Sequence, residues 1–257
     1  MPTTKVLAPI SQFDGTDRLL DHIRGALKAD LFHEIRFAIA YAKSGPLERL
    51  QADFASWKSK AAGRNAKIIL GIDQKGTSVQ ALTLALSIFD QVYVANTAGS
   101  STFHPKMYLF QGATLGRAII GSHNLTVGGT ETNLEAGVEL DYPLPAEAGD
   151  FNPFVAAWDG VVASPIAKPL TAALLQQLSN MGLLLDESAA VSAGAAKKAS
   201  VKSAGGAYPF PLVHPAPPSA LPKTAPSLKA PSAPVAAPAK SQATVLVAVA
   251  AAIGAPV

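Results

Sequence analysis

The first half of the chain alternates between two hydrophobic periods, and this alternation restricts the fold more than any other feature. Apolar side chains occupy every second position from Ile35 to Tyr41, which is typical of a half-buried strand. The segments that follow have the patterns of a helix, a strand, a second helix and a strand, over residues 46–62, 67–72, 78–89 and 91–95. Alternation of this kind predicts an α/β sandwich with a partly parallel sheet.

The flanking segments extend this prediction. Before the alternating region, residues 16–31 carry an apolar stripe with helical spacing, and Asp14 precedes it as a candidate N-cap. After it come three short strand patterns and two helical ones, over residues 106–110, 117–120, 134–141, 154–162 and 169–185. The closely spaced strands favour a mixed sheet, and the chain has no internal repeat.

Charge and composition divide the chain into two parts. All 18 acidic residues and 15 of the 21 Lys and Arg residues precede Ser188, so residues 1–187 are predicted to form the folded domain, with a net charge near −3. Residues 188–257 hold six Lys, no acid and 11 of the 20 Pro residues, a composition that predicts a disordered tail. The isoelectric point near 9.0 therefore comes from the tail. Tail lysines such as Lys197 could bind phosphates or could only keep the tail soluble.

Several features that the sequence lacks bear on the location of the protein and on its cofactors. The chain contains no Cys, which excludes disulfides and thiolate metal sites. Residues 1–10 lack the apolar core of a secretory signal, and the apolar run 243–253 is shorter than the roughly 20 residues that span a membrane. We therefore expect a cytoplasmic protein without stable membrane insertion. No His or carboxylate cluster has metal-ligand spacing, so we expect neither a metal nor a cofactor.

Candidate catalytic residues lie at the start of one predicted strand and at the end of the next. His104 and Lys106 are two apart at the start of a strand, so both side chains are expected on one face. Gly121, Ser122 and Asn124 end the next strand pattern, where a turn can present a hydroxyl and an amide beside that pair. The alternative interpretations are that His104 and Lys106 are a surface strand pair unrelated to catalysis, and that Ser122 and Asn124 are ordinary turn residues.

These residues resemble the signature of the phospholipase D superfamily, His-x-Lys followed by Gly-Ser-x-Asn. The family also has a glutamate eleven residues past the Asn, and here that residue is Glu135, although a solvated strand residue is an alternative interpretation. The family's usual Asp, five positions after the Lys, is replaced by Gln111. The resemblance covers residues 15–185 and is nearest to the single-motif, metal-independent nucleases, including the restriction-endonuclease branch. It implies a phospholipase D-like α/β/α sandwich with a mixed sheet and one motif per chain.

The chemistry of these side chains suits phosphodiester cleavage. A neutral imidazole can attack phosphorus, and a protonated one can donate to the leaving oxygen. Lys106, Asn124 and Ser122, or the backbone around Gly121, can neutralise or hydrogen-bond the phosphoryl oxygens. Glu135 can hold the far nitrogen of His104.

This mechanism needs two imidazoles, whereas the chain has a single His-x-Lys pair. We therefore predict a homodimer with one active site at the two-fold axis, acting on nucleic acid, with DNA as the expected substrate and a phosphohistidine intermediate on His104. The alternatives are a phospholipase D-type lipid or other phosphodiester hydrolase, and a non-catalytic nucleic-acid-binding module of the same fold.

The remaining candidates receive simpler interpretations. His123 is expected to point away from the site, and His22 to be an ordinary surface or boundary residue. Trp57 and Trp158 lie on apolar helical stripes and are expected in the core. Arg117 is a candidate for extra positive charge at the site.

Overall fold

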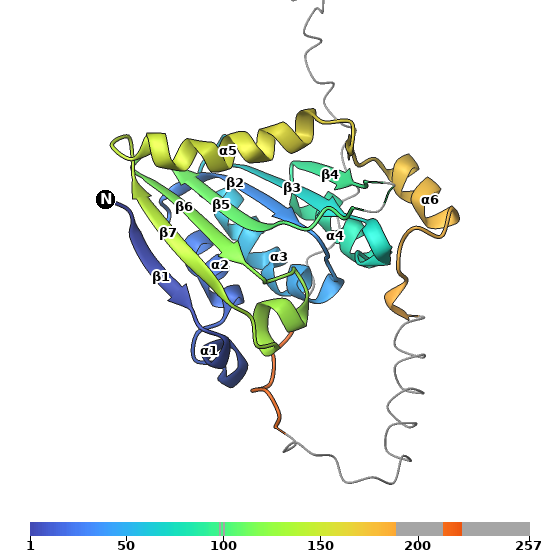
Figure 1. Cartoon of the computed structure of the whole chain (residues 1–257), viewed down its shortest axis with the longest axis horizontal. Helices are drawn as coiled ribbons and strands as arrows, with labels where there is room; N and C mark the ends of the chain where they lie inside the picture. The colour runs from blue at the N-terminus through green and yellow to red at the C-terminus, as the bar shows by residue number, and fades with distance from the viewer. Residues whose placement is uncertain (98, 100, 189–212, 223–257) are drawn as a thin grey trace, which may run out of the picture.

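One mixed sheet of eight strands forms the centre of the molecule (Figure 1). The computed structural model describes residues 1–97, 99, 101–188 and 213–222. In this part of the chain the strand order is β1-β7-β6-β5-β2-β3-β4-β8. β2, β3 and β4 run parallel to one another, and every other pairing is antiparallel. The predicted α/β class with a mixed sheet is confirmed.

The elements follow the hydrophobic patterns closely in the alternating region. The strands are β1 Thr3–Leu7, β2 Phe32–Ile39, β3 Asn65–Gly71, β4 Gln91–Ala95, β5 Lys106–Gly112, β6 Leu115–Gly121, β7 Gly137–Pro143 and β8 Ala167–Pro169. The helices are α1 Pro9–Asp14, α2 Leu19–Lys28, α3 Ser44–Ser59, α4 Val79–Ile88, α5 Ala148–Ala163 and α6 Ala172–Asn180, with short helical turns η1 Asp73–Lys75 and η2 Gly128–Thr132.

Helices cover both faces of the sheet, and each face has its own apolar core. Alternate residues of β5 divide between them: Tyr108 and Phe110 pack with α2, α3 and α4, whereas Leu109 packs with α5. Both Trp side chains are buried, Trp57 in the first core and Trp158 in the second, which confirms that prediction. The result is an α/β/α sandwich. Successive side chains of a strand point to opposite faces of the sheet, so they pack against different helical layers.

The topology brings one end of each of the eight described strands to the same edge of the sheet. β1, β2, β3, β4 and β6 end there, while β5, β7 and β8 begin there, as the pairings Ile39↔Lys106, Gly121↔Gly137 and Ala95↔Ala167 require. Every segment that carried a candidate site residue joins the sheet at this edge, so the fold determines where the site must lie.

Several boundaries differ from the predictions. The elements β1, α1, η2 and β8 were not predicted, β7 begins at Gly137 and not at residue 134, and the last helix is shorter than expected. Asp14 does not cap α2, whose N-cap is Arg18; it ends α1 and accepts hydrogen bonds from Thr16.

A ten-residue stretch of the predicted disordered tail, residues 213–222, lies against the folded body (Figure 1, orange). Ala216 N donates to Phe13 O at 2.9 Å, and the Arg49 side chain donates to Ser219 O at 2.8 Å. The prediction of disorder is therefore wrong for this stretch. Residues 189–212 and 223–257, including the apolar run 243–253, lie outside the described residues. In the part that is described, no helix is long and apolar enough to cross a membrane.

Candidate active site

His104 and Lys106 form the centre of the site at the beginning of β5. The Lys106 ammonium lies 2.7 Å from Nδ1 and 2.9 Å from Nε2 of His104, and it donates to the His104 carbonyl at 3.1 Å. The imidazole is exposed, whereas Lys106 is only 7% exposed. Burial lowers the pKa of Lys106, and the negative charge of Glu135 opposes that shift. The pair combines an accessible imidazole with a partly desolvated cation.

Tyr41, at the end of β2, packs against the imidazole. Its ring lies edge-on to His104, with centroids 5.8 Å apart, and its hydroxyl donates to Gln74 Oε1 at 3.1 Å. Gly76 makes room for this ring, because a Cβ at that position would lie 1.8 Å from Tyr41 Cδ1. Tyr41 therefore restricts the orientation of His104.

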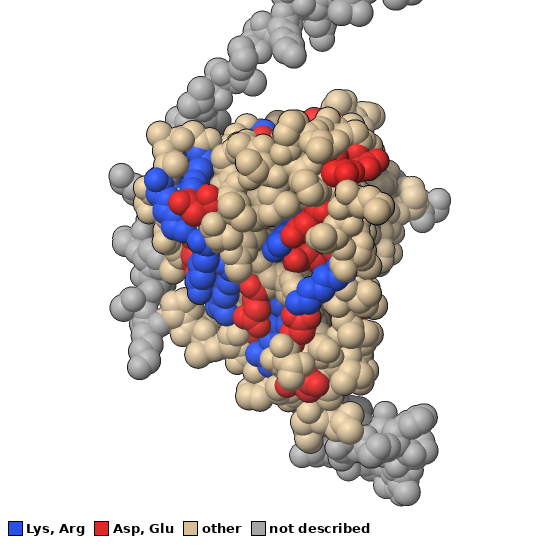
Figure 2. All heavy atoms as spheres, turned by 90° about the vertical axis from the view of Figure 1, so that its left-hand side faces the viewer, with Lys and Arg blue, Asp and Glu red and all other residues tan. Residues whose placement is uncertain are grey.

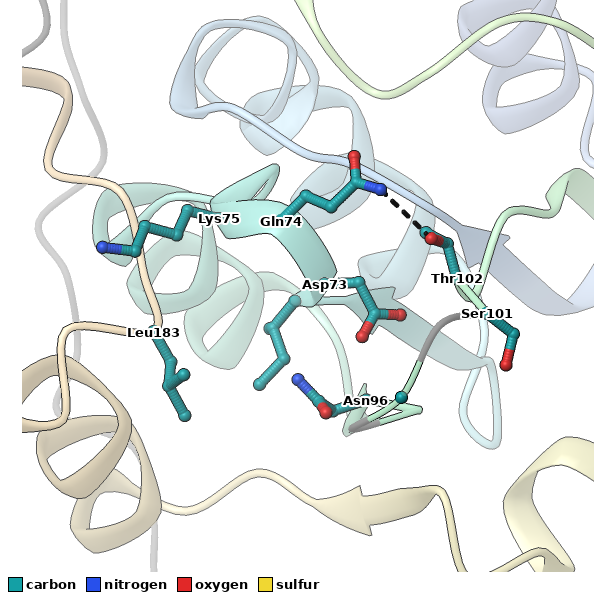
Figure 3. Close-up of a pocket in the computed structure, with 9 residues that line it drawn as sticks. Asp73, Gln74, Lys75, Asn96, Ser101, Thr102 and Leu183 are labelled. Atoms are coloured by element: carbon teal, nitrogen blue, oxygen red, sulfur yellow. Dashed lines mark hydrogen bonds between the residues drawn. The ribbon is translucent and has the colours of Figure 1, made fainter.

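A buried carboxylate organises the loop that leads into His104. Asp73, just after β3, accepts from Thr97 N at 3.1 Å and from Phe103 N at 2.8 Å, so it fastens the start and the end of the loop. Gln74 beside it has a left-handed backbone with φ of 55°, uncommon outside glycine, and its amide donates to Thr102 Oγ1 at 3.2 Å. Figure 3 shows Gln74 reaching toward Thr102 while Lys75 extends the opposite way.

The same loops line a pocket of about 470 Å³, within the size range of pockets that bind small molecules. Its lining residues are Ile72, Asp73, Gln74, Lys75, Asn96, Gly99, Ser101, Thr102 and Leu183 (Figure 3).

Asn124 is fixed by the loop that follows β2. Its Oδ1 accepts from Tyr41 N at 3.2 Å, and Leu125 N donates to Tyr41 O at 3.1 Å. With the carbonyl oxygen engaged in this way, the Nδ2 hydrogens are the part of the amide that can donate to a substrate oxygen. Tyr41 thus contacts both His104 and Asn124.

Two glycines allow the close packing around Asn124. A Cβ on Gly121 would lie 2.3 Å from Ala136 O, and one on Gly129 would lie 2.3 Å from Asn124 O. The Gly of Gly-Ser-x-Asn is therefore required for strand packing, because it lets β6 approach the segment before β7.

Ser122 and Glu135 form a second pair beside the first. The Ser122 hydroxyl makes a very short hydrogen bond to Glu135 Oε2, and Asn133 Nδ2 donates to Glu135 Oε1 at 3.1 Å. We expected Glu135 to bind the far nitrogen of His104, but the structure describes no hydrogen bond between these two side chains. The negative charge of Glu135 instead raises the pKa of Lys106, against the larger lowering by burial.

Two further His residues lie in different environments. His123 points into the protein at 2% exposure, and burial lowers its pKa. His22 is half-buried, in agreement with the predicted surface or boundary position. It lies between two carboxylates, with Nδ1 2.7 Å from Glu139 and Nε2 2.8 Å from Asp17, and this pairing was not predicted because Glu139 lies on β7, 117 residues away.

The expectation that Arg117 adds charge to the site was also wrong. It forms a bidentate ion pair with Asp141, at 2.6 and 2.7 Å, nearer the opposite end of β6 from Gly121. Gln111 accepts from Arg36 at 2.8 Å and fastens β5 to β2 away from the site. Figure 2 shows basic and acidic side chains intermixed on one face of the molecule, so that face is not uniformly basic.

Comparison with known proteins gives similarity of fold only. No family model matches the chain, and no curated protein matches it. The fold resembles those of solved bacterial proteins. These include a phospholipase D family member, Nuc from Salmonella typhimurium, at TM-score 0.49 and 14% identity, over 67% of this chain and all of that one. NucT from Helicobacter pylori follows at 0.45 and 14%, over 64% of this chain and 98% of that one. Phosphatidylserine synthase from Haemophilus influenzae Rd KW20 matches at 0.44 and 13%, over 70% of this chain and 44% of that one.

Among the described residues, no group of three or more His, Cys, Asp or Glu side chains could hold a metal ion. Tyr41 and Asp73 were missed by the sequence analysis. Tyr41 was seen only as a strand residue, and the role of Asp73 depends on backbone groups 24 and 30 residues away.

Proposed function

We propose that this protein is a metal-independent phosphodiesterase, with DNA as its substrate, that acts as an endonuclease through a phosphohistidine on His104. One observation carries the proposal: an exposed imidazole in contact with a partly buried ammonium, beside an amide whose oxygen is already engaged. Such a group of side chains provides a nucleophile, a positive charge and a hydrogen-bond donor for a phosphoryl group.

The reaction takes place in two steps. A neutral His104 nitrogen attacks phosphorus, the P–N bond forms, and the P–O bond to the leaving strand breaks. A second, protonated imidazole gives its proton to the leaving oxygen. Water then attacks phosphorus, gives a proton back to that second imidazole, and displaces His104. Lys106 and Asn124 stabilise the charge on the non-bridging oxygens in both steps.

We propose that the second imidazole is His104 of a second copy of the chain, related by a two-fold axis at this edge of the sheet. The nearby His123 is a poor candidate, because its ring is buried and burial lowers its pKa, which disfavours the protonated form that an acid must have. His104 itself is exposed, and so is the apolar side chain of Leu134, at 58%, next to Glu135. A partner subunit would cover both.

The test is cleavage of single- and double-stranded DNA by the full-length protein in excess EDTA. We expect product from the wild type and a loss of at least about 1,000-fold for His104→Ala. His33→Ala, at an exposed position on β2, is the matched control and should retain activity. Hydrolysis confined to phosphatidylcholine vesicles would replace DNA by a lipid substrate. Absence of turnover on either substrate would favour a binding module.

A further inference from the structure

The stretch of residues 213–222 occupies a site built from buried charged side chains. Glu131 on η2 is fully buried, and Arg18 and Arg49 are 8% and 9% exposed. Arg49 Nε lies 3.1 Å from Glu131 Oε1, and Arg18 Nη1 lies 3.8 Å from Oε2. Buried charges of this kind require hydrogen-bonding partners, and the 213–222 segment supplies several of them.

The contacts are made almost entirely to the backbone of the segment. Ser219 N donates to Glu131 Oε2 at 2.6 Å, and Arg49 Nε donates to Ser219 O at 2.8 Å. Arg18 Nη2 donates to the carbonyls of Ala216 and Pro217, at 3.2 and 2.8 Å. Within the part of the chain that the structure describes, one hydrogen bond reaches a side chain of the segment, from Arg24 Nη1 to Ser219 Oγ at 3.4 Å.

The composition of the segment fits this kind of recognition. Four of its ten residues are Pro, which lack an N–H, and the two that donate, Ala216 and Ser219, are the two that are partly buried. Proline also favours an extended backbone before binding, which reduces the entropy lost on docking.

The buried charged site around Glu131 is connected through η2 to the loop that carries Asn124 and Glu135. In the sequence, η2 lies between these two residues. Gly129 of η2 packs against the backbone of Asn124. The buried Gln12 side chain of α1 donates to Gly129 O at 3.1 Å and to Asn133 O at 3.2 Å. Because the 213–222 segment binds both α1, at Phe13 O, and η2, at Glu131, it fastens these two elements together.

We propose that Arg18, Arg49 and Glu131 form a binding site for the backbone of an extended, proline-rich peptide, and that residues 213–222 of the chain fill it. The bound segment braces η2 and so holds the loop that carries Asn124 and Glu135. The peptide site is independent of the proposed phosphodiesterase activity; its effect on turnover rests on that activity.

The test is amide hydrogen exchange on the full-length protein. We expect Ala216 and Ser219 to exchange at least about tenfold more slowly in the wild type than in an unstructured chain. Ser219→Pro follows a residue that is already Pro, and it removes the N–H that binds Glu131. This variant should therefore abolish the protection of Ala216 and speed exchange at Thr130 in η2. Ser219→Ala keeps the N–H and loses only the weak contact to Arg24, so it should retain protection.

Both variants lie on the surface segment, so neither is expected to unfold the body. Coil-like exchange at Ala216 and Ser219 in the wild type would overturn the proposal, and so would equal protection in the two variants. If the protein cleaves DNA, Ser219→Pro should also lower kcat by about threefold or more relative to Ser219→Ala. Failure to cleave DNA would overturn the proposed function and leave the exchange result standing.

Discussion

At the scale of single residues, the site depends on groups that hold His104 and Asn124 as much as on those two side chains. His104 is exposed and flanked by Lys106 on one side and Tyr41 on another. Asn124 is oriented by one hydrogen bond to the backbone of Tyr41. Small changes in the supporting residues should therefore alter turnover more than they alter the fold.

Asp73→Asn tests the support of the loop before His104. The amide has the shape of the carboxylate, but its NH₂ group faces one of the two backbone N–H donors of Thr97 and Phe103, which is then left unsatisfied. We expect a loss of about 1–3 kcal/mol in the free energy of unfolding. A fall in kcat of about tenfold or more should accompany it, with KM little changed. Urea denaturation and steady-state kinetics measure both, and Asp159→Asn on the exposed face of α5 is the control. An unchanged kcat would show that the loop does not position His104.

Gly76→Ala tests the packing of Tyr41. Gly76 has a right-handed φ of −66°, so the backbone accepts Ala, but the new Cβ would overlap the Tyr41 ring. Displacement of the ring should lower kcat severalfold and cost about 1–3 kcal/mol of stability. Gly160→Ala on α5 meets no neighbouring atom and should instead stabilise the protein slightly. Equal kinetics for the two variants would contradict a role for Tyr41.

Which site residues could be predicted depended on where their partners lie. His104, Lys106, Ser122 and Asn124 follow a spacing that resembles a known signature, so their convergence was predictable. Asp73 binds backbone N–H groups, which every residue type except Pro provides, and so it leaves no sequence pattern. The partner of Glu135 was wrongly predicted. A backbone hydrogen bond from Ser122 N to Ala136 O brings the serine hydroxyl to the Glu135 carboxylate.

At the scale of elements, local periodicity predicted the strands and helices that bury a whole face. β2, β3, β4 and their helices lie close to the predicted ranges, because alternating and helical apolar patterns decide them locally. β1 and β8 lie at the two sides of the sheet and depend on pairing with β7 and β4, which no local pattern encodes. η2 depends on contacts of its Gly and Glu residues with α1 and the 213–222 segment.

His22, Asp17 and Glu139 form a cluster that links α2 to β7 and makes the stability of the protein depend on pH. Burial would lower the pKa of His22, but hydrogen bonds to Glu139 and Asp17 raise it overall; Lys5 and Arg117 also adjoin the cluster. A raised pKa in the folded state means that this contribution is full below the ordinary His value of about 6.5 and is lost as pH rises through the raised value. The lowered pKa values of both carboxylates mean that their contribution is lost as the pH falls below about 4.

We therefore expect the free energy of unfolding to decline by about 1–3 kcal/mol as pH rises from about 6 to about 9 in the wild type. His22→Gln should be less stable at pH 6 and should lack this decline, whereas the exposed variant His33→Gln should keep it. Urea denaturation across this range provides the measurement. A parallel decline in both variants would contradict the assignment.

At the scale of the whole molecule, the charge of the chain says little about what it binds. The basic isoelectric point comes from residues 188–257, whereas the domain that carries the site is slightly acidic. One face of that domain shows basic and acidic side chains intermixed (Figure 2). Ion pairs such as Arg117 with Asp141 and Lys5 with Asp17 join the two signs. In the proposed mechanism, the positive charge available for a phosphoryl group comes chiefly from Lys106, and a two-fold axis would double it.

In the proposed reaction His104 forms a covalent bond to phosphorus, and this adduct can be trapped. Full-length protein would be mixed with labelled single-stranded DNA in excess EDTA and denatured in alkali, in which phosphohistidine is stable. Mass spectrometry of the digested protein would then locate the adduct. We expect a nucleotide-bearing peptide that contains His104, loses its modification in acid, and is absent from the His104→Ala variant. DNA cleavage that persists in His104→Ala, or an adduct on another residue, would contradict it.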